Sequence, residues 1–341
     1  MNAALSPTFA KPAFEVAGPA RAQVGESPLW SAAEQVLWWV DIEGRALHRF
    51  DPATGAATRW ATAERLACIA LHAQGGLLAA MESGLFHLRP HDDGTLGAAP
   101  VAGVDHPRAG MRFNDGRCDR QGRFWVTSMV RDMALADAAG SLYRFDAQGL
   151  SAPLVQGLVT GNGLAFSPAG DMLYLSDSHP SVQQVWRHAL RADGSLGPRR
   201  PFIDMRQHPG RPDGAAVDTE GCYWTCGNDA GVLLRFTPDG ALDRVLKLPV
   251  SKPSMCAFGG AQLDALYITS IVPAAPAAGF DTALDGAVLV LRPGVRGIAE
   301  AAFTPGTDQS VPSRPHAPSL SSTHRPLTSF LPPQDPKETL P

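Results

Sequence analysis

The 341-residue chain carries 29 lysine and arginine residues against 33 aspartate and glutamate residues, which gives a formal net charge of −4. An apolar fraction of 44% with 18% charged residues excludes global disorder and leaves enough material for a large core. The arginines are scattered, so no nucleic-acid partner is expected. No apolar run reaches the length of a membrane span, and the start MNAALSPTFAKPAF lacks the pattern of a signal peptide. We therefore expect a cytoplasmic protein with no membrane partner.

Six similar segments follow one another along the chain. In each segment an apolar strand is followed, after a short polar break, by a second strand that ends in a polar turn. The apolar strands contain Val36, Leu77, Phe124, Leu173, Tyr223 and Leu266, which are 41 to 50 residues apart. This is the spacing of propeller blades, which are four-stranded units of roughly 40 to 50 residues.

A turn precedes several of these marked strands. Asp119–Gly122, Ser167–Gly170 and Asp218–Gly221 each have Asp or Ser at the first position and Gly at the fourth. This arrangement is typical of a type I turn, because the first side chain accepts hydrogen bonds from the turn backbone. The turns therefore mark the links between adjacent strands of a blade.

The simplest architecture is an all-β, six-bladed β-propeller over about residues 13–303. Residues 1–12 form an N-terminal extension, and Phe14–Val16 is expected to add a strand to the last blade. A row of separate β-sandwich domains is the alternative, although it would not explain the even spacing. Residues 305–341 hold nine prolines and no alternating apolar pattern, so residues 304–341 are predicted to be a disordered tail.

The innermost strands of a propeller converge on one axis, so equivalent residues near their ends meet around a central pocket. Ten or eleven residues before the marked positions, four blades carry an oxygen-bearing side chain: Glu26, Asn114, Asn162 and Asp213. Each of them alone could be a turn former beside a glycine, but four in one register favour a site. Two carboxylates and two amides, without His or Cys, suit Ca²⁺, Mg²⁺ or Mn²⁺. The sequence therefore predicts a central metal site.

Arg112 lies two residues before Asn114, so in an extended segment both side chains point the same way. An arginine beside a metal can hold substrate oxygens and balance negative charge, although a surface arginine fits the sequence equally well. Asp115, in the same run, is interpreted as a turn former rather than a ligand. The chain has no GxSxG, GxxxxGK[ST], GxGxxG or HExxH motif, which disfavours the chemistries those motifs serve.

These residues together resemble the SMP-30/gluconolactonase/LRE family, which includes regucalcin and bacterial sugar lactonases. The matching strings are GESPLW, RFNDGRCDRQGRFWVTSM, GNGLAFSPAGDMLYLSDS, RPDGAAVDTEGCYW and AFGGAQLDALYITS, in order over about residues 21–300. The resemblance implies a six-bladed propeller with one catalytic divalent cation in the central channel. Ca²⁺ is the first expectation, and Zn²⁺, Mn²⁺ and Mg²⁺ are alternatives.

The resemblance also implies roles for individual residues. Glu26, Asn162 and Asp213 match the metal ligands, and Asp213 would also be the general base. Arg112 and Asn114 match substrate contacts. The segment after Met129 departs from the family and does not clearly supply the acidic substrate contact of some relatives, which leaves Asp132 as the candidate.

The leading functional hypothesis is a metal-dependent sugar lactonase that hydrolyses an aldonolactone of the gluconolactone type to the aldonic acid. One alternative is a calcium-dependent esterase or phosphotriesterase on the same fold. A second is a non-catalytic calcium-binding protein like regucalcin, and the least specific is a structural scaffold. The expected partner is a small-molecule sugar lactone. Because a closed propeller leaves no long sheet edge that demands a partner, we expect a monomer.

Overall fold

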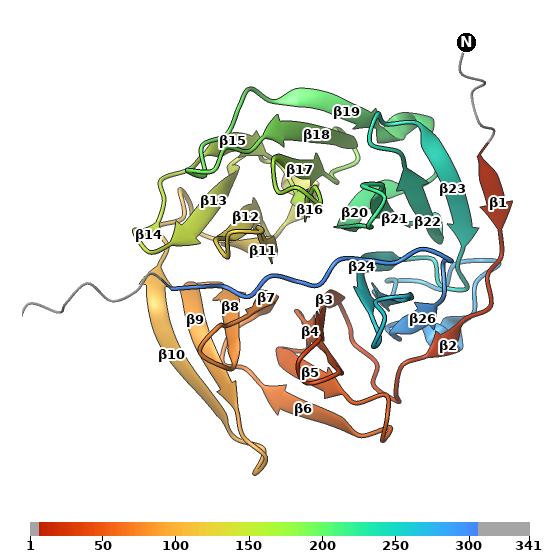
Figure 1. Cartoon of the computed structure of the whole chain (residues 1–341), viewed down its shortest axis with the longest axis horizontal. Coiled ribbons are helices and arrows are strands. Elements are labelled where there is room, and N and C mark those ends of the chain that lie inside the picture. Colours follow the sequence, from red (N-terminus) through yellow and green to blue (C-terminus); the bar gives the residue numbers. More distant parts are fainter. Residues whose placement is uncertain (1–6, 306–341) are drawn as a thin grey trace, which may run out of the picture. The chain divides into compact units, whose positions relative to one another are not determined.

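The computed structural model describes residues 7–305 of the chain. The strands form six sheets that are arranged as blades around a common axis, with the innermost strand of each blade beside that axis (Figure 1). This arrangement confirms the predicted all-β, six-bladed β-propeller. The last part of the predicted tail, residues 306–341, lies outside the described residues.

The strands of each blade follow one another in sequence, from the axis outwards. Blade 1 contains β3 (Gly25–Ser31), β4 (Val36–Asp41), β5 (Ala46–Phe50) and β6 (Ala57–Ala61), and blade 2 contains β7 (Leu66–Leu71), β8 (Leu77–Met81), β9 (Gly84–Pro90) and β10 (Leu96–Gly103). Blade 3 contains β11 (Met111–Cys118), β12 (Phe124–Val130), β13 (Gly140–Asp146), β14 (Gly149–Leu150) and β15 (Val155–Leu158). Blade 4 contains β16 (Gly161–Phe166), β17 (Met172–Asp177), β18 (Gln184–Ala189) and β19 (Arg200–Asp204). Blade 5 contains β20 (Arg211–Val217), β21 (Tyr223–Asn228), β22 (Val232–Phe236) and β23 (Leu242–Lys247), and blade 6 contains β24 (Pro253–Gly259), β25 (Ala265–Ser270) and β26 (Leu289–Leu291).

Helical structure in the described part of the chain is limited to the single turns η1 (Met133–Leu135), η2 (Met205–Gln207) and η3 (Thr282–Leu284). None of these has the length or the apolar character needed to cross a membrane. All three lie in loops that connect strands.

The hydrophobic core is divided into layers between the blades. Each buried apolar cluster draws its residues mainly from two neighbouring blades, as Trp125 of blade 3 and Leu173 of blade 4 illustrate. An inner or middle strand is thus apolar on both faces, because each face packs against a neighbouring blade. This explains why the marked strands read as nearly continuous apolar runs.

The predicted turns between first and second strands are present. The backbone amide of Gly122 donates to Asp119 O at 3.0 Å, that of Gly170 to Ser167 O at 2.9 Å, and that of Gly221 to Asp218 O at 3.0 Å. The turn glycines have positive φ angles near 75°, which glycine adopts without strain. All of these turns lie at the same end of the ring.

The N-terminal segment adds two outer strands. The predicted extra strand of blade 6 is confirmed, because β2 (Glu15–Val16) pairs antiparallel with β26. In addition, β1 (Thr8–Ala10) pairs parallel with β23 of blade 5. The strand β1 was not predicted from the sequence, because its residues fall in the segment interpreted as an extension. All three of its residues are exposed.

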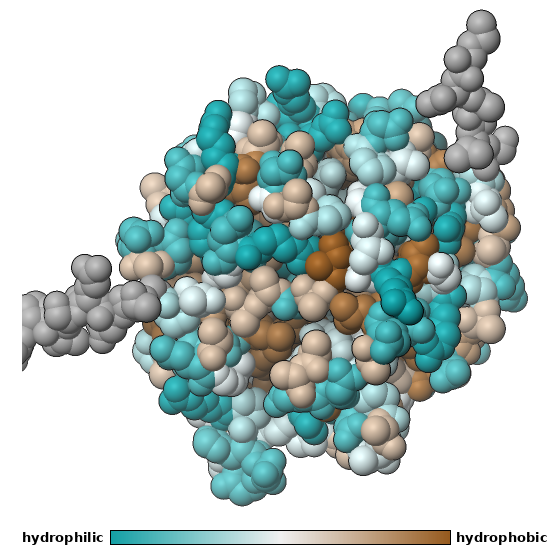
Figure 2. Space-filling model, viewed as in Figure 1, coloured by the Kyte–Doolittle hydropathy of each residue, from teal (hydrophilic) through white to brown (hydrophobic). Residues whose placement is uncertain are grey.

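A C-terminal strap, residues 296–304, crosses the end of the ring that carries these turns (Figure 1). Its backbone bonds to turns of several blades: Gly297 N to Leu263 O at 2.8 Å, Phe303 N to Leu71 O at 2.7 Å and Thr304 N to Gly122 O at 3.0 Å. Glu300 lies 3.5 Å from Arg117, which belongs to the innermost strand β11. Seen from the same side, atoms cover the centre of the ring (Figure 2). The strap therefore covers one end of the central channel.

Candidate metal and substrate site

Every innermost strand is irregular at a similar level of the channel. The ladder between first and second strands shifts register after Glu26, Leu66, Phe113, Asn162, Pro212 and Pro253. Such bulges interrupt the regular alternation of side chains and re-aim them. The candidate residues lie at these bulges, near the beginnings of the innermost strands and therefore at the end of the ring opposite the strap.

The ladder corrects one detail of the predicted register. Phe113, Gly161 and Pro212 pair with residues four positions after the marked residues of their second strands, so Asn114, Asn162 and Asp213 occupy equivalent positions. In blade 1, the residue four positions after the marked Val36 is Val40, and its partner is Glu26 itself. Glu26 is therefore one residue upstream of the common position. The reason is that the turn after β3 is one residue shorter than the turns after β11 and β20.

Asp213 is buried and is fixed by two amides. Asn162 Nδ2 donates to Asp213 Oδ1, and Asn228 Nδ2 donates to Asp213 Oδ2 at 2.6 Å. Burial raises the pKa of Asp213 to about 7, against the lowering effect of the nearby Arg211 charge and of these hydrogen bonds. The structure therefore brings two of the predicted metal ligands, Asn162 and Asp213, into contact.

The second carboxylate belongs to Glu26 of blade 1, which is separated from blade 5 by blade 6. Burial raises the pKa of Glu26 well above its ordinary value, and the negative charges of Asp213 and Asp115 raise it further. The amide of Ser27, which has a positive φ of 49°, donates to Glu26 Oε2 at 3.2 Å. The charges of the two carboxylates therefore interact, so the ionisation of one group opposes the ionisation of the other.

This donor set fits a hard divalent cation. Carboxylate and amide oxygens are the ligands that Ca²⁺, Mg²⁺ and Mn²⁺ prefer, and a cation would remove the repulsion between Glu26 and Asp213. Within residues 7–305, no three His, Cys, Asp or Glu side chains form a metal-binding group. A metal at this site would therefore depend on the amide oxygen of Asn162 in addition to the two carboxylates.

Arg112 and Asn114 form one unit beside this cluster, as their spacing predicts. Arg112 Nη1 donates to Asn114 Oδ1 at 2.6 Å and to Phe113 O at 2.8 Å. Asn114 Nδ2 donates to Gly161 O of the next blade at 2.9 Å. Burial lowers the pKa of Arg112, while the charges of nearby carboxylates oppose that effect. The guanidinium consequently lies inside the channel and not on the outer surface.

Asp115 has a role that sequence analysis missed, and its interpretation as a turn former is wrong. It is buried within β11, where its backbone amide donates to Thr127 Oγ1 at 3.1 Å. Its Oδ2 accepts from the amide of Leu164 in blade 4 at 2.7 Å. Asp115 therefore links blade 3 to β16 of blade 4, the strand that carries Asn162. No local sequence signal reveals a contact between blades.

Asn228 was also missed as a site residue, although the run Gly227–Gly231 is unusually polar for a strand end. It orients Asp213, and Arg211 lies behind it, with Nη1 donating to Ser178 O at 3.0 Å. Arg211 Nη2 lies 3.5 Å from Asn228 Oδ1. The second carboxylate oxygen of Asp213 is thus supported by a chain of polar contacts from blade 5 and blade 4.

Asp132 lies outside this cluster. It is exposed and begins η1, where its Oδ1 accepts from the amide of Ala134 at 3.1 Å. The capping contact accounts for its position in the fold. A contact between Asp132 and a substrate stays a prediction.

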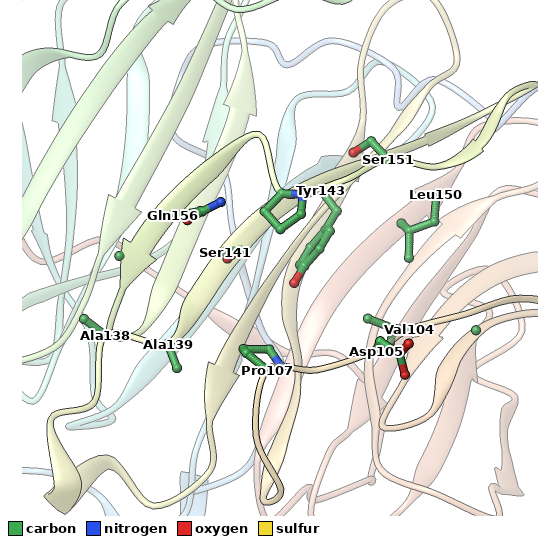
Figure 3. A pocket seen from close by; sticks show the side chains of 13 residues that line it. Val104, Asp105, Pro107, Ala138, Ala139, Ser141, Tyr143, Leu150, Ser151 and Gln156 are labelled. Atoms are coloured by element: carbon green, nitrogen blue, oxygen red, sulfur yellow. The ribbon is translucent and has the colours of Figure 1, made fainter.

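A cavity of about 560 Å³ lies away from the channel, between blades 2 and 3. Tyr143 and Ser141 of β13 lie on one side of it, and Val104, Asp105 and Pro107 lie on the connection between the blades (Figure 3). None of the candidate site residues lines this cavity. The chemistry predicted from the sequence therefore belongs to the channel and not to this cavity.

Comparison with known proteins places the chain in a family. Residues 24–272 match the SMP-30/Gluconolactonase/LRE-like region. The chain is 40% identical over 287 residues to a 6-deoxy-6-sulfogluconolactonase of Pseudomonas putida, covering 82% of this chain and 94% of that protein. It is 32% identical over 249 residues to a pentonolactonase of Haloferax volcanii, covering 73% of this chain and 81% of that protein. A calcium-binding regucalcin from Agrobacterium tumefaciens has a TM-score of 0.78 at 26% identity, covering 88% of this chain and 100% of that structure. The chain belongs to the SMP-30/gluconolactonase/LRE family.

Proposed function

We propose that this protein is a metal-dependent hydrolase that opens an aldonolactone to the corresponding aldonic acid. The observation that carries the proposal is the buried carboxylate of Asp213. Two side-chain amides orient it, and its charge interacts with the second buried carboxylate, Glu26. Relatives named for lactones of sulfogluconate, pentonates and L-arabinose support the reaction class. Because those names differ in the sugar, they support the reaction more strongly than any one substrate.

Glu26, Asn162 and Asp213 would hold the cation. When bound, a divalent cation supplies Lewis-acid polarisation of a carbonyl and a counter-charge for the oxyanion that develops on it. Ca²⁺ is the proposed ion, with Zn²⁺, Mn²⁺ and Mg²⁺ as alternatives.

Asp213 would accept the proton of the attacking water. A general base works best when its pKa lies near the working pH, and burial raises the pKa of Asp213 to about 7. The amides of Asn162 and Asn228 hold the carboxylate in one orientation, which reduces the reorganisation needed for proton transfer. Arg112 and Asn114 would bind hydroxyl or carbonyl oxygens of the sugar.

Acid release from a panel of fresh aldonolactones tests the proposal. The protein is stripped of metal and assayed against the spontaneous background, and each divalent cation is then restored in turn. We expect metal-dependent acceleration on at least one lactone. Metal binding without turnover would instead favour the calcium-binding alternative, and a preference for aryl esters or organophosphates would favour the esterase alternative.

The substitution Asp213→Asn tests the role of the base. We expect a loss in kcat of at least about 100-fold, because general-base catalysis contributes roughly 10²- to 10⁴-fold. In chelator, the melting temperature should not fall, since Asn keeps the volume of the side chain. Asp239→Asn, in an exposed turn of blade 5, is the matched control and should leave kcat unchanged. Near wild-type turnover by Asp213→Asn would overturn the assignment.

A further inference from the structure

Four blades place a basic residue at one level of the channel, just beyond the bulges. Leu66, Phe113, Pro212 and Pro253 pair with residues at a common position in their second strands. The residue before each of them is basic, and these four residues are named the cationic collar: Arg65, Arg112, Arg211 and Lys252. The innermost strands run from this level towards the strap, so the collar lies on the side of the channel that the strap leaves uncovered.

The charges of three collar residues act on the site or on one another. The Arg65 charge helps to lower the pKa of Arg112, whose main cause is burial, while the charge of Glu26 acts in the opposite direction. The Arg211 charge lowers the pKa of Asp213 against the dominant effect of burial. Arg65, Arg112 and Arg211 therefore lie close enough to the predicted site for their charges to interact with it or with one another.

In blades 5 and 6, two basic groups of the collar pair with a single carboxylate. Arg211 Nε lies 2.6 Å from Asp229 Oδ2, and Lys252 Nζ pairs with the other oxygen of the same carboxylate. One carboxylate thus serves two cations. The Nζ of Lys252 has three donors, and Asp229 is its only ion-pair partner among the described residues.

The opposite side of the collar is also incompletely neutralised. Arg65 pairs with Glu43 and Glu82, and Arg131 shares Glu82. Among residues 7–305, no carboxylate lies at ion-pair distance from Arg112, which is half-buried and senses the charges of Glu43 and Glu26 only from further away. A half-buried cation with no directly paired carboxylate would be stabilised by a bound anion.

We propose that the cationic collar selects lactones that carry an anionic group, such as a sulfonate, carboxylate or phosphate, at the terminus away from the lactone carbonyl. This inference rests on the proposed lactonase function. Arg112 contacts Asn114 directly, so it is assigned to the part of the substrate beside the metal ligands. Lys252, supported by Arg211, is assigned to the terminal anion, because it belongs to blade 6, across the ring from Arg112 in blade 3, and its ammonium keeps donors that Asp229 does not use.

The test compares one aldonolactone with a hydroxymethyl terminus to the same lactone with a terminal sulfonate, carboxylate or phosphate. We expect wild-type kcat/KM to be at least about tenfold higher for an anionic form, since one charge-assisted contact corresponds to a factor of this order. The ranking of the three anionic forms identifies which group the mouth accepts. Raised ionic strength should reduce kcat/KM for the anionic forms and leave the neutral form unchanged.

Lys252→Met isolates the collar from the catalytic residues. We expect KM for the preferred anionic lactone to rise about tenfold, with kcat and the neutral lactone little changed. Lys247→Met, on the outer strand of blade 5, is the matched control and should alter neither substrate. Equal wild-type rates for neutral and anionic forms, or an equal loss on both in Lys252→Met, would overturn the inference while the lactonase function stands.

A binding titration keeps the two proposals distinguishable if no lactone is opened. The probes are a sugar alcohol and the same sugar alcohol with a terminal sulfonate, titrated into the metal-loaded wild-type and Lys252→Met proteins. Tighter binding of the sulfonated probe to the wild type, lost in Lys252→Met, supports the collar even without turnover. Equal binding of both probes contradicts it.

Discussion

Asp213 and Glu26 are held in the folded protein in a way that opposes their ionisation. Burial raises the pKa of Asp213 to about 7, and burial together with the Asp213 charge raises the pKa of Glu26. A carboxyl group whose folded pKa exceeds its unfolded value binds its proton more tightly in the folded state. Its contribution to stability is therefore complete below about pH 4 and is lost as the pH rises towards 7. Without a cation, the site destabilises the fold at neutral pH.

The substitution Asp213→Asn should therefore stabilise the metal-free protein at neutral pH, because Asn imitates the protonated carboxyl group. We expect its melting temperature in chelator to match that of the wild type near pH 4.5 and to exceed it by a few °C at pH 7.5. Saturating Ca²⁺ should reverse the order at pH 7.5, since the cation stabilises the ionised wild-type site. Thermal unfolding at both pH values measures this. A wild type that is the more stable of the two in chelator at pH 7.5 would contradict it.

The residues that sequence reasoning found and those it missed differ in kind. Asn162, Asp213 and the pair Arg112 and Asn114 could be predicted, because their positions follow from strand register within one blade. Asn228 and Asp115 could not, because each acts through a contact that only the folded ring creates. Roles in catalysis and metal binding remain predictions for all of them.

At the scale of single elements, the turns that lead from first to second strands have a common construction in blades 3 and 5. Asp218 is fully buried, and its Oδ1 accepts from the backbone amides of Glu220 and Cys222 at 2.9 and 3.0 Å. Its Oδ2 accepts from Trp224 Nε1 and Arg235 Nε, both at 2.8 Å. One carboxylate thus fixes the turn, a core tryptophan and a strand of the same blade.

Asp119 repeats this construction in blade 3. Its Oδ1 accepts from the amides of Gln121 and Arg123 at 2.9 and 3.1 Å. Its Oδ2 accepts from Trp125 Nε1 at 2.8 Å and Arg123 Nε at 2.6 Å. The sequence pattern predicted the backbone turn in both blades, but it could not show that the tryptophan six residues later is held by the same carboxylate.

Asp218→Ala should therefore destabilise the protein by about 2 to 4 kcal/mol, because it removes one of the three carboxylates that pair with Arg235 and leaves Trp224 Nε1 and two turn amides without their acceptor. Denaturant unfolding of the metal-loaded protein measures the loss. Asp239→Ala, in the exposed turn of the same blade, should change the free energy of unfolding by less than about 1 kcal/mol. Similar values for the two variants would show that the buried network contributes little.

The two N-terminal strands should differ in what they contribute. Deleting residues 1–11 removes β1, whose residues are exposed, and is expected to change the melting temperature by only a few °C. Deleting residues 1–18 also removes β2, which exposes the edge of β26. The hydrogen bond from Ala17 N to Val288 O, at 2.8 Å, is lost with it. We expect that variant to unfold at a temperature lower by 10 °C or more, or to aggregate through the open edge. Equal stability of the two deletions in thermal unfolding would contradict a closing role for β2.

At the scale of the whole described ring, the repeat made the architecture predictable. A spacing of 41 to 50 residues and the matching polar turns are local properties, and they determine the number and order of the blades. The strap and β1 were not predicted, because neither has a periodic pattern and both are held by backbone bonds to distant blades. The strap covers the end of the ring opposite the collar, so the collar lies at the end of the ring that the strap does not cross.

Closure by β2 also has a consequence for biosynthesis. Glu15 pairs with Val290, which is 275 residues later in the chain, so β2 cannot complete its blade until β26 has been synthesised. At roughly 5 to 20 residues per second, that interval is on the order of 15 to 55 s. Blades 1 to 5 can each complete a sheet of their own strands as they leave the ribosome, whereas blade 6 cannot. The nascent chain therefore holds β2 unpaired while the residues between β2 and β26 are made, a period in which a chaperone or a neighbouring nascent chain competes for the same edge.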